Sequence, residues 1–179
     1  MIVEKNLKVG VVGASGTLGS ALKNTIPNAT VINRTDNVFL SNDSFDVTFV
    51  CAPSGLKWFA NQHPNRDLIE VENLISLLEK ITTNRFILFS TIDAIGEEAR
   101  PPNYYGMHRK KLEDYIGEKQ RGSIIRLGAL VAPFIKKNFL NDIKEGNTKY
   151  FPNLHSKFQF SNLFEWNDLI HIILEQEFS

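Results

Sequence analysis

The stretch VGVVGASGTLGSAL, residues 9–22, decides the fold because it joins a run of valines to three glycines and then to a helix-forming segment. Gly13, Gly16 and Gly19 are spaced three residues apart. They follow a predicted strand and open a predicted helix, and this context gives a glycine-rich segment a specific meaning. The first glycine permits a tight turn, the second lets a ligand approach the backbone, and the third lets helix and strand pack closely.

The predicted helix begins at these glycines, so its free N–H groups and partial positive charge face the turn. Ser15 and Thr17 add hydroxyl donors, and Leu18 belongs to the same turn. The segment therefore favours binding of a dinucleotide through its pyrophosphate. The alternative is a glycine-rich turn that only packs helix against strand.

The rest of the chain alternates between strand-like and helix-like patterns. Short apolar runs bounded by turn residues predict strands covered on both faces, at residues 7–12, 29–33, 45–51, 85–90 and 122–127. Apolar residues at helical spacing predict helices at residues 17–26, 66–81 and 105–119. This alternation implies an α/β fold, a Rossmann-like doubly wound parallel sheet with right-handed crossovers. Only residues 34–44 separate the second and third strands, which is short for a crossover that includes a full helix.

Composition excludes several classes of function. The 179 residues contain 20 Lys plus Arg and 20 Asp plus Glu, so no net positive charge favours nucleic acid as a partner. Pro133 and Arg126 interrupt the most apolar run, which is too short to cross a membrane. The single cysteine, Cys51, cannot form an internal disulfide, and the N-terminus lacks the pattern of a signal peptide. These features predict one cytoplasmic domain over residues 1–179.

The GxxGxxG spacing resembles the short-chain dehydrogenase/reductase superfamily, especially its extended and atypical branches. In that superfamily a catalytic Ser or Thr ends the fourth strand, where this chain has Ser90 and Thr91. The next helix of the superfamily starts with Tyr-x-x-x-Lys, and here Tyr105 is followed by Arg109 at the lysine position.

A closer resemblance covers most of the chain. The segments APSGLKWFANQHPNRD (52–67), FSTIDAIG (89–96), YGMHRKKLEDYI (105–116), IIRLGALVAPFIKKN (124–138) and KFQFSNLFEWNDL (157–169) are similar to a family of small proteins related to nucleotide-sugar epimerases and reductases. Its members are described as sugar epimerases or NAD(P)-dependent oxidoreductases. Tyr-Gly-x-His-Arg is usual in that family, so the resemblance implies that arginine at the lysine position is a family feature.

The resemblance implies a reaction in which a tyrosine transfers a proton while the nicotinamide transfers hydride at the same carbon. Thr91, Tyr105 and Arg109 are then the candidate catalytic residues. Tyr105 and Arg109 share one helix face because they are four residues apart, so we expect Arg109 to lower the pKa of Tyr105. If Arg109 only replaces a lysine, Arg109→Lys should keep or raise activity. The alternative is a structural Tyr105 beside a solvated Arg109.

The expected cofactor is NADP or NAD. An acidic residue about 20 residues past the glycines is typical of NAD-binding proteins, whereas here the second strand ends in Asn33 and Arg34, which favours NADP; Asp36 could reverse this choice. The full set of candidate cofactor-binding residues is Gly13, Ser15, Gly16, Thr17, Leu18, Gly19, Asn33, Arg34, Ala52, Pro53, Leu127 and Gly128.

Substrate contacts are assigned to residues after the third and fifth strands, namely Trp58, Asn61, Lys136, Lys137 and Asn138. The two lysines could neutralise a diphosphate, although a solvated helix face explains them equally well. Trp58 could also be plain core. We expect no metal site, because the histidines lack metal-ligand spacing.

Extended members of the superfamily carry a large C-terminal cap, but here only residues 128–179 follow the fifth strand. We expect a reduced cap with a helix at 134–145, an extended piece at 157–163 and a helix at 165–177. Either the substrate is compact, or a second subunit of a homodimer completes the pocket, or no substrate is turned over. The sequence therefore favours an NAD(P)-dependent epimerase or reductase acting on a sugar or nucleotide-sugar. The alternative is a non-catalytic NAD(P)-binding redox sensor.

Overall fold

The computed structural model describes residues 7–33, 44–96, 103–119, 122–132, 135, 143–146 and 158–178. The chain divides into two compact units, Met1–Arg126 and Leu127–Ser179. Each unit is described by itself below. No helix within the described ranges is long and apolar enough to cross a membrane.

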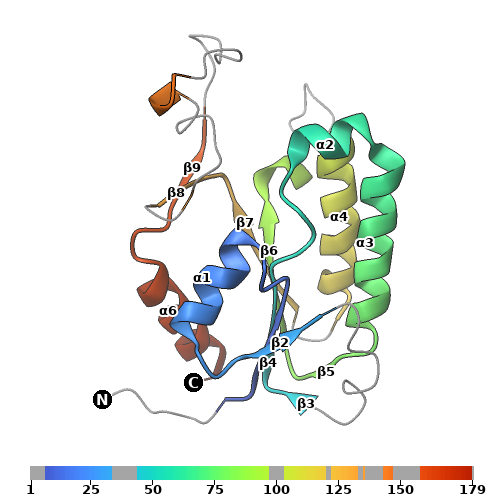
Figure 1. Cartoon of the computed structure of the whole chain (residues 1–179). Helices are drawn as coiled ribbons and strands as arrows, with labels where there is room; N and C mark the ends of the chain where they lie inside the picture. The colour runs from blue at the N-terminus through green and yellow to red at the C-terminus, as the bar shows by residue number, and fades with distance from the viewer. Residues whose placement is uncertain are drawn as a thin grey trace. The chain divides into compact units, whose positions relative to one another are not determined.

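A five-stranded sheet forms the centre of the first unit (Figure 1). Its strands lie in the order β2 (Thr30–Ile32), β1 (Val9–Val12), β4 (Val47–Val50), β6 (Phe86–Thr91) and β7 (Gly122–Leu127). β1 pairs in parallel with both β2 and β4, and β4 pairs in parallel with β6. Every residue of β1 and β4 is buried, as expected of apolar strands covered on both faces. The predicted α/β Rossmann-like fold is confirmed.

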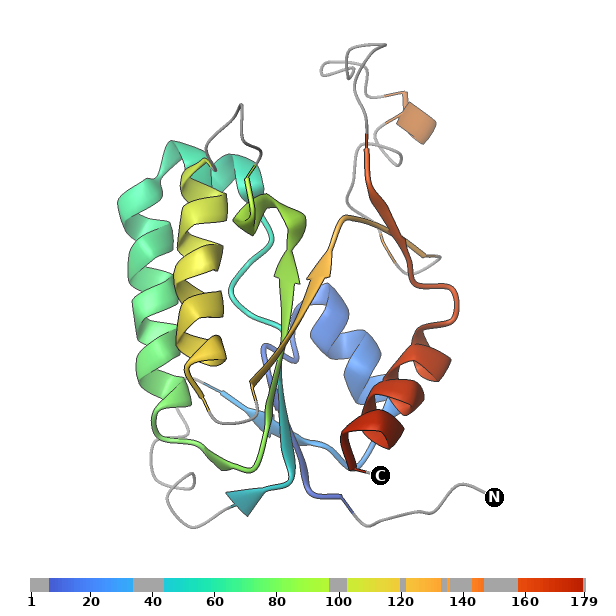
Figure 2. The same cartoon turned by 180° about the vertical axis from the view of Figure 1, so that it is seen from behind.

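Helices cover the two faces of this sheet (Figures 1 and 2). α1 (Thr17–Thr25) lies on one face, and α3 (Pro64–Leu78) and α4 (Tyr104–Gly117) lie side by side on the other. The apolar stripe of α3 enters the core, where Val71, Leu74 and Leu78 are buried with Leu112 and Ile116 of α4. This stripe is the one that predicted the helix.

Several small elements were not predicted, among them α2 (Lys57–Gln62), β3 (Ser44–Phe45) and β5 (Thr82–Thr83). α2 is one short helix with a single buried residue, Ala60, so it has almost no apolar periodicity to detect. β3 and β5 form a two-residue parallel pair. The expectation that no full helix links β2 to β4 concerns residues 34–43, which lie outside the described residues.

In the second unit, β8 (Ala129–Val131) and β9 (Phe160–Asn162) form a parallel pair. α6 (Trp166–Phe178) follows. The predicted extended piece and terminal helix are thus confirmed, whereas most of the predicted helix at 134–145 lies outside the described residues. A reduced substrate cap over residues 128–179 stays a prediction.

Candidate functional site

The glycine loop lies where the connections of the sheet diverge. The chain leaves the carboxyl end of β1 for α1 and returns in β2 on one side, whereas β4 flanks β1 on the other side. Ligands of open α/β sheets bind in the crevice at such a switch point. Gly13 turns the chain there with φ +83°, a backbone conformation that favours glycine. The N–H of Gly16 donates to the carbonyl of Gly13 at 3.0 Å and closes the turn.

Close packing explains the third glycine. A Cβ atom on Gly19 would lie 2.2 Å from the carbonyl oxygen of Gly13, so α1 can approach the loop only with glycine at this position. Gly16 is the residue before α1, and no side-chain hydrogen bond caps the helix there. Ser15, Gly16 and Thr17 are exposed. The loop therefore presents backbone and hydroxyl groups to solvent at a helix N-terminus, as anion binding requires.

The segment after β4 borders the same loop. A Cβ atom on Gly13 would lie 2.9 Å from the carbonyl carbon of Cys51 and 3.0 Å from the Cβ of Ala52. Ala52 thus lies against the glycine loop, and Pro53, the next residue along the chain, is partly exposed like Ala52. Burial raises the pKa of the Cys51 thiol to about 12.

Thr91 ends β6 and begins η1, a single 3₁₀ turn at Ile92–Ala94. Its hydroxyl donates to the carboxylate of Asp93 at 3.2 Å and accepts from the N–H of Asp93 at 3.2 Å. Asp93 also forms an ion pair with Lys57 of α2.

The neighbouring Ser90 belongs to a different network. Its hydroxyl donates to Glu113 at 2.6 Å, and Glu113 is also bound by two nitrogens of Arg126 at 2.8 to 3.1 Å. Glu113 is 2% exposed. Ser90 is therefore bound to the buried Glu113. Thr91 is the hydroxyl residue of β6 that interacts with Tyr105.

Tyr105, in the first turn of α4, brings the three candidate catalytic residues together. Burial is the strongest influence on its pKa and raises it, while Arg109 and a hydrogen bond with Thr91 act in the opposite direction. The guanidinium carbon of Arg109 lies 4.4 Å from the centre of the Tyr105 ring. The expected lowering by Arg109 is thus present, but the net pKa of Tyr105 lies above its ordinary value because burial outweighs the cation.

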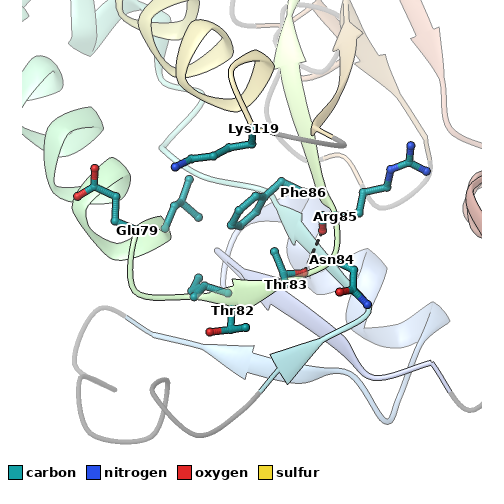
Figure 3. Close-up of a pocket in the computed structure, with 9 residues that line it drawn as sticks. Glu79, Thr82, Thr83, Asn84, Arg85, Phe86 and Lys119 are labelled. Carbon is teal, nitrogen blue, oxygen red and sulfur yellow. Dashed lines mark hydrogen bonds between the residues drawn. The ribbon is translucent and has the colours of Figure 1, made fainter.

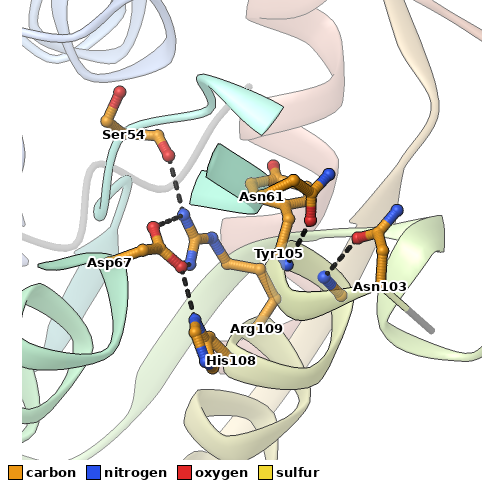
Figure 4. A network of polar contacts seen from close by, with 8 residues as sticks. Ser54, Asn61, Asp67, Asn103, Tyr105, His108 and Arg109 are labelled. Carbon is orange, nitrogen blue, oxygen red and sulfur yellow. Dashed lines mark hydrogen bonds and ion pairs between the residues drawn. The ribbon is translucent and has the colours of Figure 1, made fainter. Parts of the chain in front are cut away.

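Arg109 is buried rather than solvated, with 4% of its surface exposed. Its guanidinium donates to both carboxylate oxygens of Asp67 at 2.9 and 3.0 Å and to the carbonyl of Ser54 at 2.8 Å (Figure 4). Nδ1 of His108 lies 2.8 Å from the same carboxylate. Burial alone would raise the pKa of Asp67, but the hydrogen bonds and charges of Arg109 and His108 hold it below its usual range.

Two asparagines fix the start of α4 (Figure 4). The side-chain oxygen of Asn103 accepts the N–H of Gly106 at 3.0 Å, as in an ordinary N-cap. The side-chain oxygen of Asn61, from α2, accepts the N–H of Tyr105 at 3.1 Å. The structure thus gives Asn61 a contact that positions Tyr105. Trp58, on the same short helix, is 60% exposed, which contradicts a plain core role.

The other candidate residues are described one by one. Asn33 is exposed immediately after β2. Leu127 and Gly128 belong to the second unit, where the N–H of Gly128 donates to the hydroxyl of Ser161 at 2.9 Å. Arg34, Asp36, Lys136, Lys137 and Asn138 lie outside the described residues. Within the described ranges, no group of three or more metal-binding side chains is brought together.

Figure 3 shows a depression in the surface that none of the candidate site residues lines. Residues 82–86 and Lys119 line it. Because β6 begins at Phe86, this depression lies at the amino end of the strand, whereas Thr91 marks the carboxyl end. Ligands of parallel sheets bind at the carboxyl ends, so we assign the depression no role.

Comparison with known proteins supports the fold. No family model and no curated protein matches the chain. Among solved structures it is similar to a dTDP-4-dehydrorhamnose reductase from Clostridium acetobutylicum, with a TM-score of 0.69 and 18% identity over 96% of this chain and 71% of that chain. It is likewise similar to UDP-N-acetylglucosamine 4-epimerase from Bacillus cereus, with a TM-score of 0.69 and 18% identity over 96% and 72%.

A third similar structure is MoeE5 in complex with UDP-glucose and NAD, with a TM-score of 0.69 and 14% identity over 96% of this chain and 72% of that chain. Such identities show a shared fold and nothing finer. The chain therefore has the Rossmann-like fold of nucleotide-sugar reductases and epimerases, as its resemblance to the short-chain dehydrogenase/reductase superfamily implied.

Asp67, His108 and Ser54 were not predicted from the sequence as part of this site. Asp67 lies 42 residues before its partner Arg109, and helical or strand periodicity cannot predict a contact between residues so far apart in the sequence. One signal was available: Asp67 falls four residues before Val71, on the buried stripe of α3. A carboxylate on an apolar face needs a partner.

Proposed function

We propose that this chain is an NAD(P)-dependent epimerase or reductase that acts on a sugar or nucleotide-sugar, with Tyr105 as the proton-transfer group. The observation that carries the proposal is the meeting of Thr91, Tyr105 and Arg109 at the carboxyl edge of a sheet whose switch point holds the glycine loop. The similarity in fold to nucleotide-sugar reductases and epimerases supports it.

The described residues fit a dinucleotide. The exposed N-terminus of α1 and the close-packed Gly13 and Gly19 leave backbone N–H groups available for a pyrophosphate. The segment after β4, with Ala52 and Pro53, would border the bound cofactor because it contacts the glycine loop. When bound, NAD(P)H or NAD(P)⁺ supplies or accepts a hydride at the substrate carbon.

Tyr105 would move the matching proton at the oxygen on that carbon. For reduction of a carbonyl, the Tyr105 hydroxyl gives its proton to the oxygen as the carbon gains hydride; for oxidation of an alcohol, both transfers reverse. The Thr91 hydroxyl would hydrogen-bond the same oxygen. Burial favours the neutral phenol of Tyr105, which suits it to donate a proton in the reducing direction.

The test is turnover with a panel of UDP-, GDP- and dTDP-sugars and either cofactor, followed by NAD(P)H absorbance or by epimer analysis. Tyr105→Phe should lower kcat by about 100-fold or more, because general acid–base catalysis contributes about that much. NADPH affinity should stay close to that of the wild type, because the variant deletes only one oxygen. Tyr104→Phe is the matched control, since Tyr104 is exposed and adjacent.

Full turnover in Tyr105→Phe would contradict the assignment. Cofactor binding without turnover of any sugar by the wild-type protein would favour a non-catalytic NAD(P)-binding protein. Lys136 and Lys137 belong to the same proposal: replacing both with alanine should weaken sugar-nucleotide binding and leave NADPH binding unchanged, as calorimetry on the cofactor-loaded protein would measure.

Preference for NADP rests on Arg34 and is tested by thermal shift. A ligand at 100 times its dissociation constant stabilises the folded state by about 2.7 kcal/mol, so the preferred cofactor at equal concentration gives the larger shift. We expect that cofactor to be NADPH. A larger shift with NADH would contradict the preference, and no shift with either would contradict dinucleotide binding.

A further inference from the structure

Arg109 is buried and is bound by two groups, the carboxylate of Asp67 and the carbonyl of Ser54. Its side chain is 5% exposed and that of Asp67 is 6% exposed. The two planar groups make a paired contact, with one nitrogen donating to each carboxylate oxygen at 2.9 and 3.0 Å. The carbonyl of Ser54 takes a further N–H at 2.8 Å. Bidentate pairs of this kind fix the orientation of the guanidinium as well as its position.

The orientation of the Arg109 guanidinium determines its contact with Tyr105, which lies one helical turn before it on α4. The guanidinium carbon is 4.4 Å from the centre of the Tyr105 ring, within the range of a cation–π contact. α4 supplies both residues, while α3 supplies Asp67. The carboxylate therefore holds the cation from the side of α3, and the ring covers it from α4.

We propose that Asp67 is a positioning residue that holds Arg109 against Tyr105, and that Arg109 acts on Tyr105 instead of binding the ribose of the cofactor. The proposal extends the proposed function by assigning Asp67 a role in the same site. It also explains why arginine suits this position, since a lysine ammonium could not reach both oxygens of Asp67 and the carbonyl of Ser54 in one plane.

Two charged groups, Arg109 and Asp93, act on Tyr105, and each of them is paired with charged groups from neighbouring elements. Arg109 lies on its own helix, and Asp93 faces it from η1. Lys57 of α2 forms an ion pair with Asp93. Asp67 of α3 binds both Arg109 and His108 of α4. Arg109 favours the tyrosinate form and Asp93 opposes it. Movement of Arg109 should therefore be readable as a change in the ionisation of Tyr105.

The first experiment measures that ionisation in the cofactor-free protein, so it needs no turnover. Difluorotyrosine, whose fluorines acidify the phenol, is incorporated at the four tyrosines, and ¹⁹F NMR is recorded against pH, with Tyr105→Phe assigning the signal. In Arg109→Met, the tyrosinate-to-tyrosine ratio of residue 105 at fixed pH should fall about tenfold, because a close cation is lost. An unchanged ratio would overturn the proposal.

A double-mutant cycle tests whether Asp67 acts through Arg109. Asp67→Asn alone should lower the tyrosinate ratio about threefold or more, because the guanidinium is no longer held against the ring. In the Arg109→Met background the same substitution should change the ratio by less than about twofold. This double variant replaces the ion pair by neutral groups, so it avoids an unpaired buried charge. A rise in the ratio in Asp67→Asn, or an equal effect in both backgrounds, would overturn the proposal.

Asp114→Asn is the matched control for the cycle. Asp114 also lies on α4 and pairs with a cation, Lys110, but its side chain is 56% exposed. It should leave the Tyr105 signal unchanged. A shift as large as that of Asp67→Asn would show that any carboxylate near α4 has this effect and would overturn the specific role of Asp67.

The second experiment tests the ribose by calorimetric titration with NADPH. If Arg109 does not bind the ribose, Arg109→Lys and Arg109→Met should have dissociation constants within about twofold of each other. Binding about tenfold tighter in Arg109→Lys than in Arg109→Met would show that a cation at this position serves the cofactor, and would overturn the proposal. Because neither experiment uses a sugar substrate, failure here is distinguishable from failure of the proposed reaction.

Discussion

Gly19 shows at the residue scale how little room the loop leaves. Gly19→Ala would place a methyl group 2.2 Å from the carbonyl oxygen of Gly13, so the backbone must shift. We expect unfolding by urea to show a loss of about 2 kcal/mol or more, in the range for overpacking. Gly117→Ala is the control, because nothing lies within 4 Å of a Cβ atom there. A loss in Gly19→Ala no larger than in the control would contradict the close packing.

Arg109 provides a second prediction for a single residue. One reading of the sequence was that Arg109 only replaces a lysine. The structure instead shows a buried guanidinium bound to Asp67 and Ser54. Arg109→Lys should therefore lower kcat/KM by about tenfold instead of keeping or raising it, because lysine cannot make the paired contact. Steady-state kinetics on the substrate found in the panel measures this, and equal or higher activity would restore the view that Arg109 only stands in for lysine.

The same residues show what sequence could supply. The spacing of Tyr105 and Arg109 correctly predicted that they share a helix face, because helical geometry depends on residues four apart. The cation then proved to be shared with Asp67, on a different helix. The net direction of the Tyr105 pKa could not be predicted either, since it depends on burial that only the packed structure defines.

At the scale of elements, the start of α4 is determined by two side chains from different segments. Asn61→Ala removes the acceptor for the N–H of Tyr105 and should cost about 1 kcal/mol of stability, as the loss of a helix cap does. Asn61→Asp keeps an acceptor and adds a negative charge at a helix N-terminus, so it should restore the stability. Thermal unfolding of both variants measures the effect, and equal losses would show that Asn61 is not a cap.

Elements with strong periodicity were predictable and those without it were not. α3 and α4 were found within a few residues of their ends. The apolar stripe of α3 runs over several turns, and α4 buries Tyr105, Leu112 and Ile116 on one face at helical spacing. α2 was missed because six residues with one buried position carry no such pattern. The pairing of β8 with β9 joins residues about thirty apart, and register of this kind depends on tertiary contacts.

For the whole molecule, the ion pair between Asp67 and Arg109 predicts how the free energy of unfolding depends on pH. The folded pKa of Asp67 lies below its ordinary value, so the carboxylate contributes stability that is present above about pH 4 and is lost as the pH falls through the folded pKa. Asp67→Asn should cost about 3 kcal/mol near pH 7, because Arg109 is left buried without its partner. The difference between wild type and variant should shrink below about pH 4, as urea unfolding at several pH values would show. A difference independent of pH would contradict the ion pair.

A crystal structure with NADP would show whether the glycine loop and Tyr105 serve one bound dinucleotide. We predict that the pyrophosphate lies at the glycine loop and the N-terminus of α1, and that the nicotinamide C4 faces the Tyr105 hydroxyl with room for one substrate carbon and its oxygen between them. A dinucleotide bound elsewhere, or a nicotinamide directed away from Tyr105, would contradict this prediction.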